Sequence, residues 1–205
     1  MTEEIKYFLL GLIQGLAEFF PVSSSGHIIL LSSVLDIVEK DPLLLSITVH
    51  FATTLSTIIV YRKKISQLFM GVFRHKDCHQ ISYLLKLLIS SFPLIIVGLF
   101  FKNDVELVFS NSNRVVSIML IITAGILIST KFFYTGEKKI NYYHAFCMGI
   151  MQAIAILPGI SRSGATISIA IFFKIDRKSA AEFSFLMVLL PIMGIMFLEL
   201  IYITN

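Results

Sequence analysis

Charged residues are scarce in this sequence: they make up 15% of its 205 residues, while 56% are hydrophobic. A soluble domain of this size has about 25% charged residues, so the composition excludes an ordinary soluble protein. A mean hydropathy of +0.85 favours an integral membrane protein instead. The net charge of +4 predicts no nucleic-acid partner, because the basic residues stand at the ends of apolar runs, where they set membrane topology.

Cysteine is also rare, and the two that occur, Cys78 and Cys147, have neither a disulfide pattern nor the spacing of metal ligands. We therefore expect both to be free thiols. The first residues include Glu3 and Glu4 where a signal peptide would be basic, and no small-residue cleavage site follows the first apolar run. The sequence therefore predicts no cleaved signal peptide.

Four apolar segments are near the ~20 residues that cross a bilayer as a helix, namely residues 43–61, 81–101, 115–133 and 180–202. The loops that follow residues 61 and 133 are rich in Lys and Arg, which predicts that they face the cytoplasm. The loop between residues 101 and 115 balances its charges and is expected on the outer side. These segments predict about four full spans.

Two further apolar regions, residues 5–35 and 142–173, are broken near their middle by Pro, Gly and Ser. Acidic residues dominate both flanks of the first region, and basic residues dominate both flanks of the second. A segment whose two ends lie on the same side of the membrane does not span it. We therefore predict two re-entrant helical hairpins, one entering from each face of an all-α, polytopic membrane protein.

The two broken regions are related by an internal repeat. Residues 11–27 align with residues 149–165 without a gap, at a constant offset of 138. Identical residues stand opposite Gly11, Gln14, Ala17, Ser23, Ser25 and Gly26. With the opposite flanking charges, this predicts an inverted repeat, a plan that places a polar site near the membrane midplane. We divide residues 1–205, a single membrane domain, into a first unit (1–135) and a truncated second unit (142–205), to which another chain could add surface.

Polar side chains at membrane depth usually serve function. The first hairpin carries Glu18, Ser23, Ser24, Ser25 and His27, and the second carries Ser161, Arg162, Ser163 and Thr166. The fork of donors on Arg162 suits phosphate oxygens, and Gly26 and Gly164 let backbone N–H groups approach an anion at a helix start. Ser24 is a candidate nucleophile if His27 takes its proton. The pattern predicts one phosphate-handling site built from both hairpins.

Each of these residues also has a structural interpretation. Serine hydroxyls in membrane helices often bond to their own backbone, and glycines permit close helix packing. Glu18 could serve only as the counter-ion that Arg162 needs. His50 lies within a predicted span beside Thr53 and Thr54, and it is as well explained by helix packing as by a site.

The segment from Gln14 to His27, QGLAEFFPVSSSGH, and the segment from Pro158 to Thr166, PGISRSGAT, resemble the two signature motifs of the bacterial undecaprenyl-diphosphate phosphatases of the bacitracin-resistance type. AAEFSF at residues 180–185 and Pro191 also fit this family. The resemblance implies hydrolysis of a polyprenyl diphosphate lipid to the monophosphate carrier of cell-wall synthesis. It places the protein in the bacterial plasma membrane, with the site open to the outer face, and it implies a divalent cation, Mg²⁺ or Ca²⁺.

The same resemblance marks six positions as functional: Glu18, Ser24, His27, Ser161, Arg162 and Thr166. Gln14 stands where the family motif often has a first carboxylate, so Glu18 and Gln14 are the expected metal ligands. Ser24 or a water molecule would attack, with His27 as base or acid. The alternatives are a lipid-phosphate flippase or transporter, or an inactive truncated member that only binds or assembles. A homo-oligomer remains open.

Overall fold

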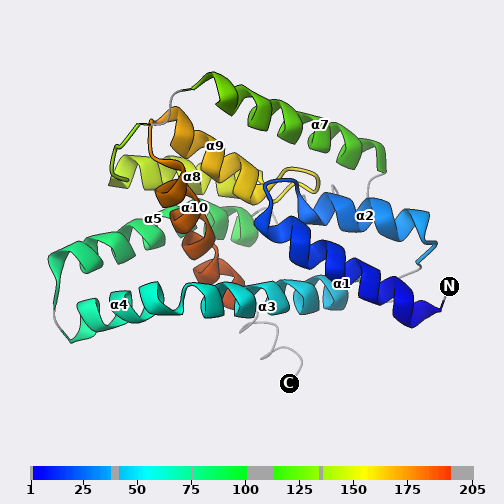
Figure 1. Ribbon diagram of the computed structural model, residues 1–205, viewed down its shortest axis with the longest axis horizontal. Helices are drawn as coiled ribbons and strands as arrows, with labels where there is room; N and C mark the ends of the chain where they lie inside the picture. The colour runs from blue at the N-terminus through cyan, green and yellow to red at the C-terminus, as the bar shows by residue number, and fades with distance from the viewer. Residues whose placement is uncertain (1, 38–41, 75, 101–112, 134–135, 195–205) are drawn as a thin grey trace.

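The computed structural model describes residues 2–37, 42–74, 76–100, 113–133 and 136–194, and for residues 42–47 it describes the backbone alone. Throughout these ranges the regular structure is helical, apart from an isolated bridge between Lys138 and Ile175. The predicted all-α class is therefore confirmed. The helices are α1 Glu3–Phe19, α2 Ser24–Val34, α3 Pro42–Val60, α4 Arg62–Phe73, α5 Cys78–Phe100, α7 Asn113–Ser129 with the 3₁₀ turn η1 Thr130–Phe132, α8 Tyr142–Ile154, α9 Arg162–Phe172 and α10 Arg177–Met187 (Figure 1).

Two helical hairpins occupy the broken regions of the sequence. Helix α1 packs on α2, and α8 packs on α9. In the first hairpin α1 ends before Pro21, and Phe20 is extended because proline disfavours a helical conformation in the residue before it. In the second hairpin α8 ends at Ile154, and the turn that follows includes Pro158. Helices α2 and α9 begin and end at the offset of 138 that relates the two sequences, residues 24–34 and 162–172.

Both second helices of the hairpins begin with the same cap. The Ser23 hydroxyl accepts the Gly26 N–H at 3.4 Å, and the Ser161 hydroxyl accepts the Gly164 N–H at 3.0 Å. A serine side chain at this position satisfies one of the backbone donors that a helix start leaves unpaired. The repeat is therefore visible in local structure as well as in sequence.

Among the described residues, α5 and the continuous helix Asn113–Phe132 are long and apolar enough to cross a membrane, each with a mean hydropathy of 2.1. They coincide with the predicted spans 81–101 and 115–133. Helix α3 matches the prediction for residues 43–61, and its described side chains form a shorter apolar helix, Thr48–Val60. The predicted span 180–202 lies partly outside the described residues. Within them, α10 begins earlier, at Arg177, and the helix is interrupted at Val188.

Large apolar side chains cover much of the outer surface, for example Phe100, Ile121 and Phe132, which are 75%, 71% and 81% exposed. A water-soluble monomer rarely exposes so much apolar surface, whereas lipid solvates it well. The buried core lies instead where α5, α8, α9 and α10 meet and includes Met148, Phe183 and Met187. Helices α5 and α8 approach closely at Gly149, where any Cβ would overlap the Ser90 backbone.

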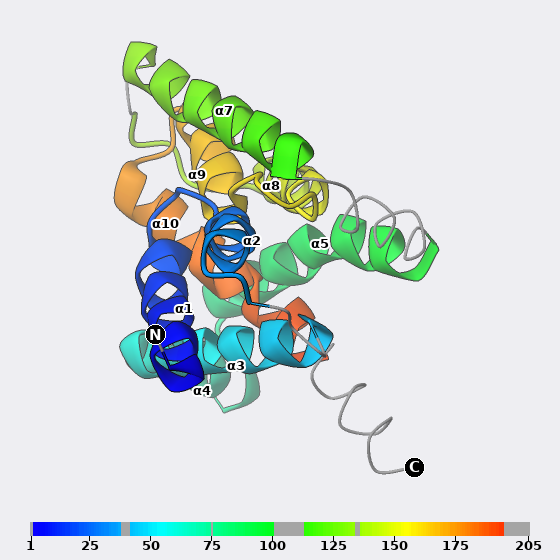
Figure 2. The same cartoon turned by 90° about the vertical axis from the view of Figure 1, so that its right-hand side faces the viewer.

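Helix α7 joins the two hairpins, because it packs on both α2 and α9. Figure 2 shows α2 end-on, with α1 on one side and α7 and α9 above it. Helix α10 then supports α9 from the other side. The Asp176 side chain caps α10 by accepting the Ser179 N–H at 3.0 Å. The hydrogen bonds from the Ser179 side chain and backbone hold the pKa of this carboxyl below its usual value.

Candidate active site

The tips of the two hairpins meet. A Cβ on Gly26 would lie 3.0 Å from the Gly159 Cα, and a Cβ on Gly164 would lie 2.9 Å from the Pro21 carbonyl oxygen. Only glycine permits such contact between backbones. The Ser163 hydroxyl also donates to the Phe20 carbonyl at 3.5 Å. The convergence of the two Ser/Gly segments, which the sequence predicted, is confirmed.

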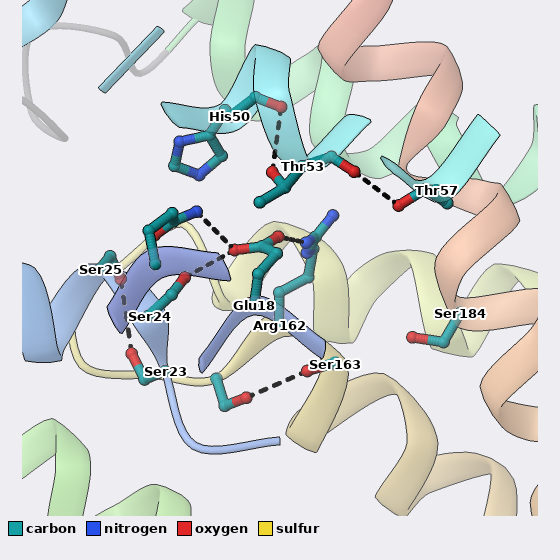
Figure 3. A network of polar contacts seen from close by, with 12 residues as sticks. Glu18, Ser23, Ser24, Ser25, His50, Thr53, Thr57, Arg162, Ser163 and Ser184 are labelled. Carbon is teal, nitrogen blue, oxygen red and sulfur yellow. Dashed lines mark hydrogen bonds and ion pairs between the residues drawn. The ribbon is translucent and has the colours of Figure 1, made fainter. Parts of the chain in front are cut away.

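Glu18, at the end of α1, lies at the centre of the junction and is 8% exposed (Figure 3). Its Oε2 accepts hydrogen bonds from Gln14 Nε2 at 3.0 Å and from Ser24 Oγ at 2.6 Å. Its Oε1 pairs with Arg162 Nη2 from the second hairpin. One carboxylate therefore holds a hydroxyl from its own hairpin and a guanidinium from the other.

His27 lies one turn into α2 and is exposed. Its Nδ1 is 2.8 Å from the Ser23 carbonyl oxygen, so this nitrogen carries the proton and donates. The Ser24 hydroxyl donates to Glu18, so the structure gives Ser24 a different partner from the one the sequence suggested. A direct role of His27 in activating Ser24 stays a prediction.

The serines of the two tips are arranged as matched pairs. Ser23 Oγ lies 3.4 Å from Ser25 Oγ, and Ser161 Oγ lies 3.4 Å from Ser163 Oγ. Ser23 has a φ of 66°, a left-handed conformation that residues other than glycine rarely adopt. Such strain is often found at functional sites. The two capped helix starts bring their positive ends to one place, which favours an anion there.

Thr166 is predicted to bind phosphate, and in the structure its hydroxyl contacts other groups of the protein. Its hydroxyl lies 2.6 Å from Ser184 Oγ of α10 and donates to the Arg162 carbonyl at 2.8 Å. The side chain is fully buried. Thr166 therefore ties the first turn of α9, and with it Arg162, to α10.

Two positions outside the motifs also take part. Thr123 of α7 donates to the Gly159 carbonyl at 2.9 Å and accepts the Ser161 N–H at 3.0 Å, and so it fixes the turn before α9. His50 of α3 interacts electrostatically with Glu18, and its ring faces the carboxylate in Figure 3. The sequence left His50 open, and the structure places it at the site. Sequence reasoning missed Thr123, for which a polar residue near the middle of an apolar span was the available signal.

Among the residues that the structure describes, no three His, Cys, Asp or Glu side chains gather closely enough to hold a metal ion. Beside the Glu18 carboxylate, Gln14 nevertheless presents a buried Oε1 that has no hydrogen-bond partner in the described part of the chain. Amide and carboxylate oxygens suit Mg²⁺ and Ca²⁺, and Mg²⁺ commonly uses one or two protein ligands together with water and substrate phosphates. The two side chains therefore fit a cation shared with a phosphate group. Cys78 and Cys147 are free thiols, as expected.

The fold and this junction define a helical membrane protein with a buried acid–base cluster between two hairpin tips. The chain belongs to the family of bacitracin resistance protein BacA, which matches residues 7–205. It is 46% identical over 189 residues to an undecaprenyl-diphosphatase of Christiangramia forsetii, covering 91% of this chain and 71% of that protein.

Two other relatives carry the same name. The undecaprenyl-diphosphatase of Bacteroides thetaiotaomicron is 40% identical over 191 residues, which cover 93% of this chain and 72% of the relative. That of Methanococcus vannielii is 38% identical over 198 residues, which cover 96% and 78%. The similarity to these enzymes thus includes both hairpins and the helices between them.

Proposed function

We propose that this protein is an undecaprenyl-diphosphatase, which hydrolyses undecaprenyl diphosphate to undecaprenyl phosphate and inorganic phosphate. The observation that carries the proposal is the Glu18 carboxylate, joined to the Ser24 hydroxyl and the Arg162 guanidinium where two helix starts meet. The family and its named relatives agree with this chemistry. Hydrolysis recycles the lipid carrier of cell-wall synthesis, and carrier recycling accounts for bacitracin resistance.

Positioning and charge neutralisation supply most of the catalysis in phosphoryl transfer. Arg162 and the N–H groups at the starts of α2 and α9 bind the phosphate oxygens. Ser24 Oγ attacks the terminal phosphorus, the bond from this phosphorus to the bridging oxygen breaks, and the lipid monophosphate leaves. The Ser24 proton passes to Glu18, to which the hydroxyl already donates at 2.6 Å. A water molecule then attacks the phosphorus and gives a proton to His27, the bond from phosphorus to Ser24 Oγ breaks, and Oγ takes its proton back from Glu18 as inorganic phosphate leaves.

In this proposal Glu18 and Gln14, whose Oε1 has no hydrogen-bond partner among the described residues, would hold a divalent cation, Mg²⁺ or Ca²⁺. A cation bound there would neutralise charge on the diphosphate. We expect chelation by EDTA to abolish phosphate release and either ion to restore it. Full activity in EDTA after exhaustive dialysis would contradict the assignment.

The hairpins enter the membrane from opposite faces as halves of an inverted repeat, and the site opens to the outer face of the plasma membrane. The shared offset of 138 in the bounds of α2 and α9, and the two matched serine caps, support the repeat. The opposite charges that flank the two hairpins support their orientation.

The test is phosphate release from undecaprenyl diphosphate by the purified chain in detergent. We expect the wild type to release phosphate and Arg162→Ala to reduce release by at least about 100-fold, as when a main anion-binding donor is lost. Arg177→Ala is the matched control, because Arg177 is an exposed arginine at the start of α10, outside the site. Lipid translocation by reconstituted protein without phosphate release would favour a flippase or transporter instead.

A further inference from the structure

Helix α3 presents three buried threonines to the hairpin junction: Thr53, Thr54 and Thr57, which are 6%, 4% and 5% exposed. Two of the hydroxyls are used within the helix. Thr53 donates to the carbonyls of Val49 and His50, and Thr57 donates to the Thr53 carbonyl at 2.9 Å. The Thr54 hydroxyl, in contrast, has no hydrogen-bond partner in the described structure.

A second donor is unpaired nearby. Arg162 uses Nη2 for Glu18, while its buried Nη1 has no partner among the described residues. Figure 3 shows the guanidinium reaching from α9 toward α3. Arg162, Thr54 and Glu18 line one small cavity of about 10 Å³. Its remaining wall includes the apolar side chains of Phe185 and Leu189.

Glu18 accepts from Gln14, Ser24 and Arg162 Nη2, but no oxygen of Glu18 lies within hydrogen-bond distance of the Thr54 hydroxyl or Arg162 Nη1. Buried polar groups are nearly always hydrogen-bonded in native proteins. Two donors that face one cavity without an acceptor therefore call for an acceptor from outside the chain. The positive charge of Arg162 favours an anionic oxygen. A volume of about 10 Å³ has room for one water-sized group and excludes a prenyl chain.

We propose that the Thr54 hydroxyl and Arg162 Nη1 together bind one oxygen of the substrate's diphosphate. This inference rests on the proposed function and adds α3 as a third wall of the phosphate site. The two hairpin tips supply backbone donors and the nucleophile, and α3 supplies a hydroxyl to an oxygen on the opposite side of the guanidinium. Thr54 thereby fixes the orientation of the phosphate relative to Ser24.

Three variants of the full chain, purified in detergent, test the inference. Thr54→Val removes the hydroxyl and keeps the shape, and we expect kcat/KM to fall about tenfold, the size of one hydrogen bond to a charged group. Thr54→Ser keeps the hydroxyl and should stay within about threefold of wild type. Thr57→Val is the matched control one turn away: Thr57 lines the same cavity, but its hydroxyl already donates to the Thr53 carbonyl, so kcat/KM should stay within about threefold of wild type.

Thermal unfolding gives a readout that a structural role would not produce. Without ligand, Thr54→Val should unfold at the wild-type midpoint or above it, because it removes a buried hydroxyl that lacks a partner. Orthovanadate, a phosphate analogue, should raise the midpoint of the wild type and of Thr57→Val. We expect the rise for Thr54→Val to be smaller by about half or more, as linkage requires for weaker binding.

The outcomes separate the two proposals. A wild-type chain that releases no phosphate contradicts the proposed function itself. An active wild type with an unchanged kcat/KM in Thr54→Val overturns the role of Thr54 and leaves the proposed function intact. A Thr54→Val variant that unfolds at a lower temperature, together with a Thr54→Ser variant that does not recover activity, would make the hydroxyl structural and also overturn the inference.

Discussion

The ion pair between Glu18 and Arg162 has either a catalytic role or only a structural one. A set of three variants distinguishes these two roles. The two side chains are 9% and 20% exposed, so the pair is largely withdrawn from water. Glu18→Gln or Arg162→Met alone leaves an uncompensated buried charge, which typically costs 3–5 kcal/mol. The partial exposure of Arg162 places the expected loss near the lower end, about 3 kcal/mol.

The double variant, Glu18→Gln with Arg162→Met, removes both charges together. We expect it to recover most of the lost stability, because replacing a whole buried pair by neutral groups is often neutral or stabilising. Phosphate release should nevertheless stay at least about 100-fold below wild type, since the anion-binding group is gone. Unfolding by titrated denaturant in mixed detergent micelles, followed by circular dichroism, measures stability, and phosphate release on the same preparations measures activity.

The chain offers a matched control in Lys64 and Glu182, an ion pair of 2.9 Å whose side chains are 31% and 27% exposed. Lys64→Met should cost no more than about 1 kcal/mol, because solvent screens a half-exposed pair. It should leave phosphate release unchanged. A stable double variant at the junction that releases phosphate as fast as wild type would refute the catalytic assignment and make the pair structural.

Three further predictions concern single positions. Ser24→Ala should lower kcat by more than about 1000-fold if Ser24 is the nucleophile, whereas a loss of only about tenfold, the size of its hydrogen bond to Glu18, would assign the attack to water. Gln152→Leu should raise the free energy of unfolding by about 1–3 kcal/mol, because both amide atoms of Gln152 are buried without partners among the described residues, and a destabilised variant would contradict this. Asp176→Ala should cost about 1 kcal/mol as a lost helix cap. Hydrogen bonds lower the pKa of Asp176 in the folded state. Its contribution to the free energy of unfolding is therefore complete above the ordinary carboxyl pKa of about 4, and it is lost as the pH falls through the lower pKa of the folded state. Thermal midpoints of wild type and Asp176→Ala should therefore converge in acid and differ at pH 7.

The repeat made the meeting of the hairpins predictable. Serine and glycine at equivalent positions, with a proline near the middle of each region, predicted two interrupted helical segments, and α2 and α9 indeed share one offset in their bounds. The partner of Ser24 was not predictable from spacing. Ser24 and His27 stand three residues apart, which places neighbours on one helix face. Side chains of helical residues tilt toward the N-terminus, however, and at the first position of α2 this tilt carries Ser24 back toward Glu18.

Contributions from helices outside the motifs needed the structure. His50 and Thr54 lie four residues apart in α3, a spacing that places both on one face. The sequence alone does not say which helix this face meets, because charge patterns fix the side on which a helix ends and leave its neighbours open. The same holds for Thr123, whose role depends on α7 packing against the turn before α9.

The chemistry of the site depends on differences between the two copies. Gln14 donates to Glu18, whereas Ile156 stands at the position equivalent to Glu18, and the buried amide of Gln152 has no partner within the described ranges. Arg162 stands opposite Ser24 in the alignment. The ion pair across the junction therefore joins two residues whose counterparts in the other copy, Ile156 and Ser24, carry no charge. The interrupted helices and their serine caps are common to both hairpins, whereas the charged pair occurs where the two copies differ.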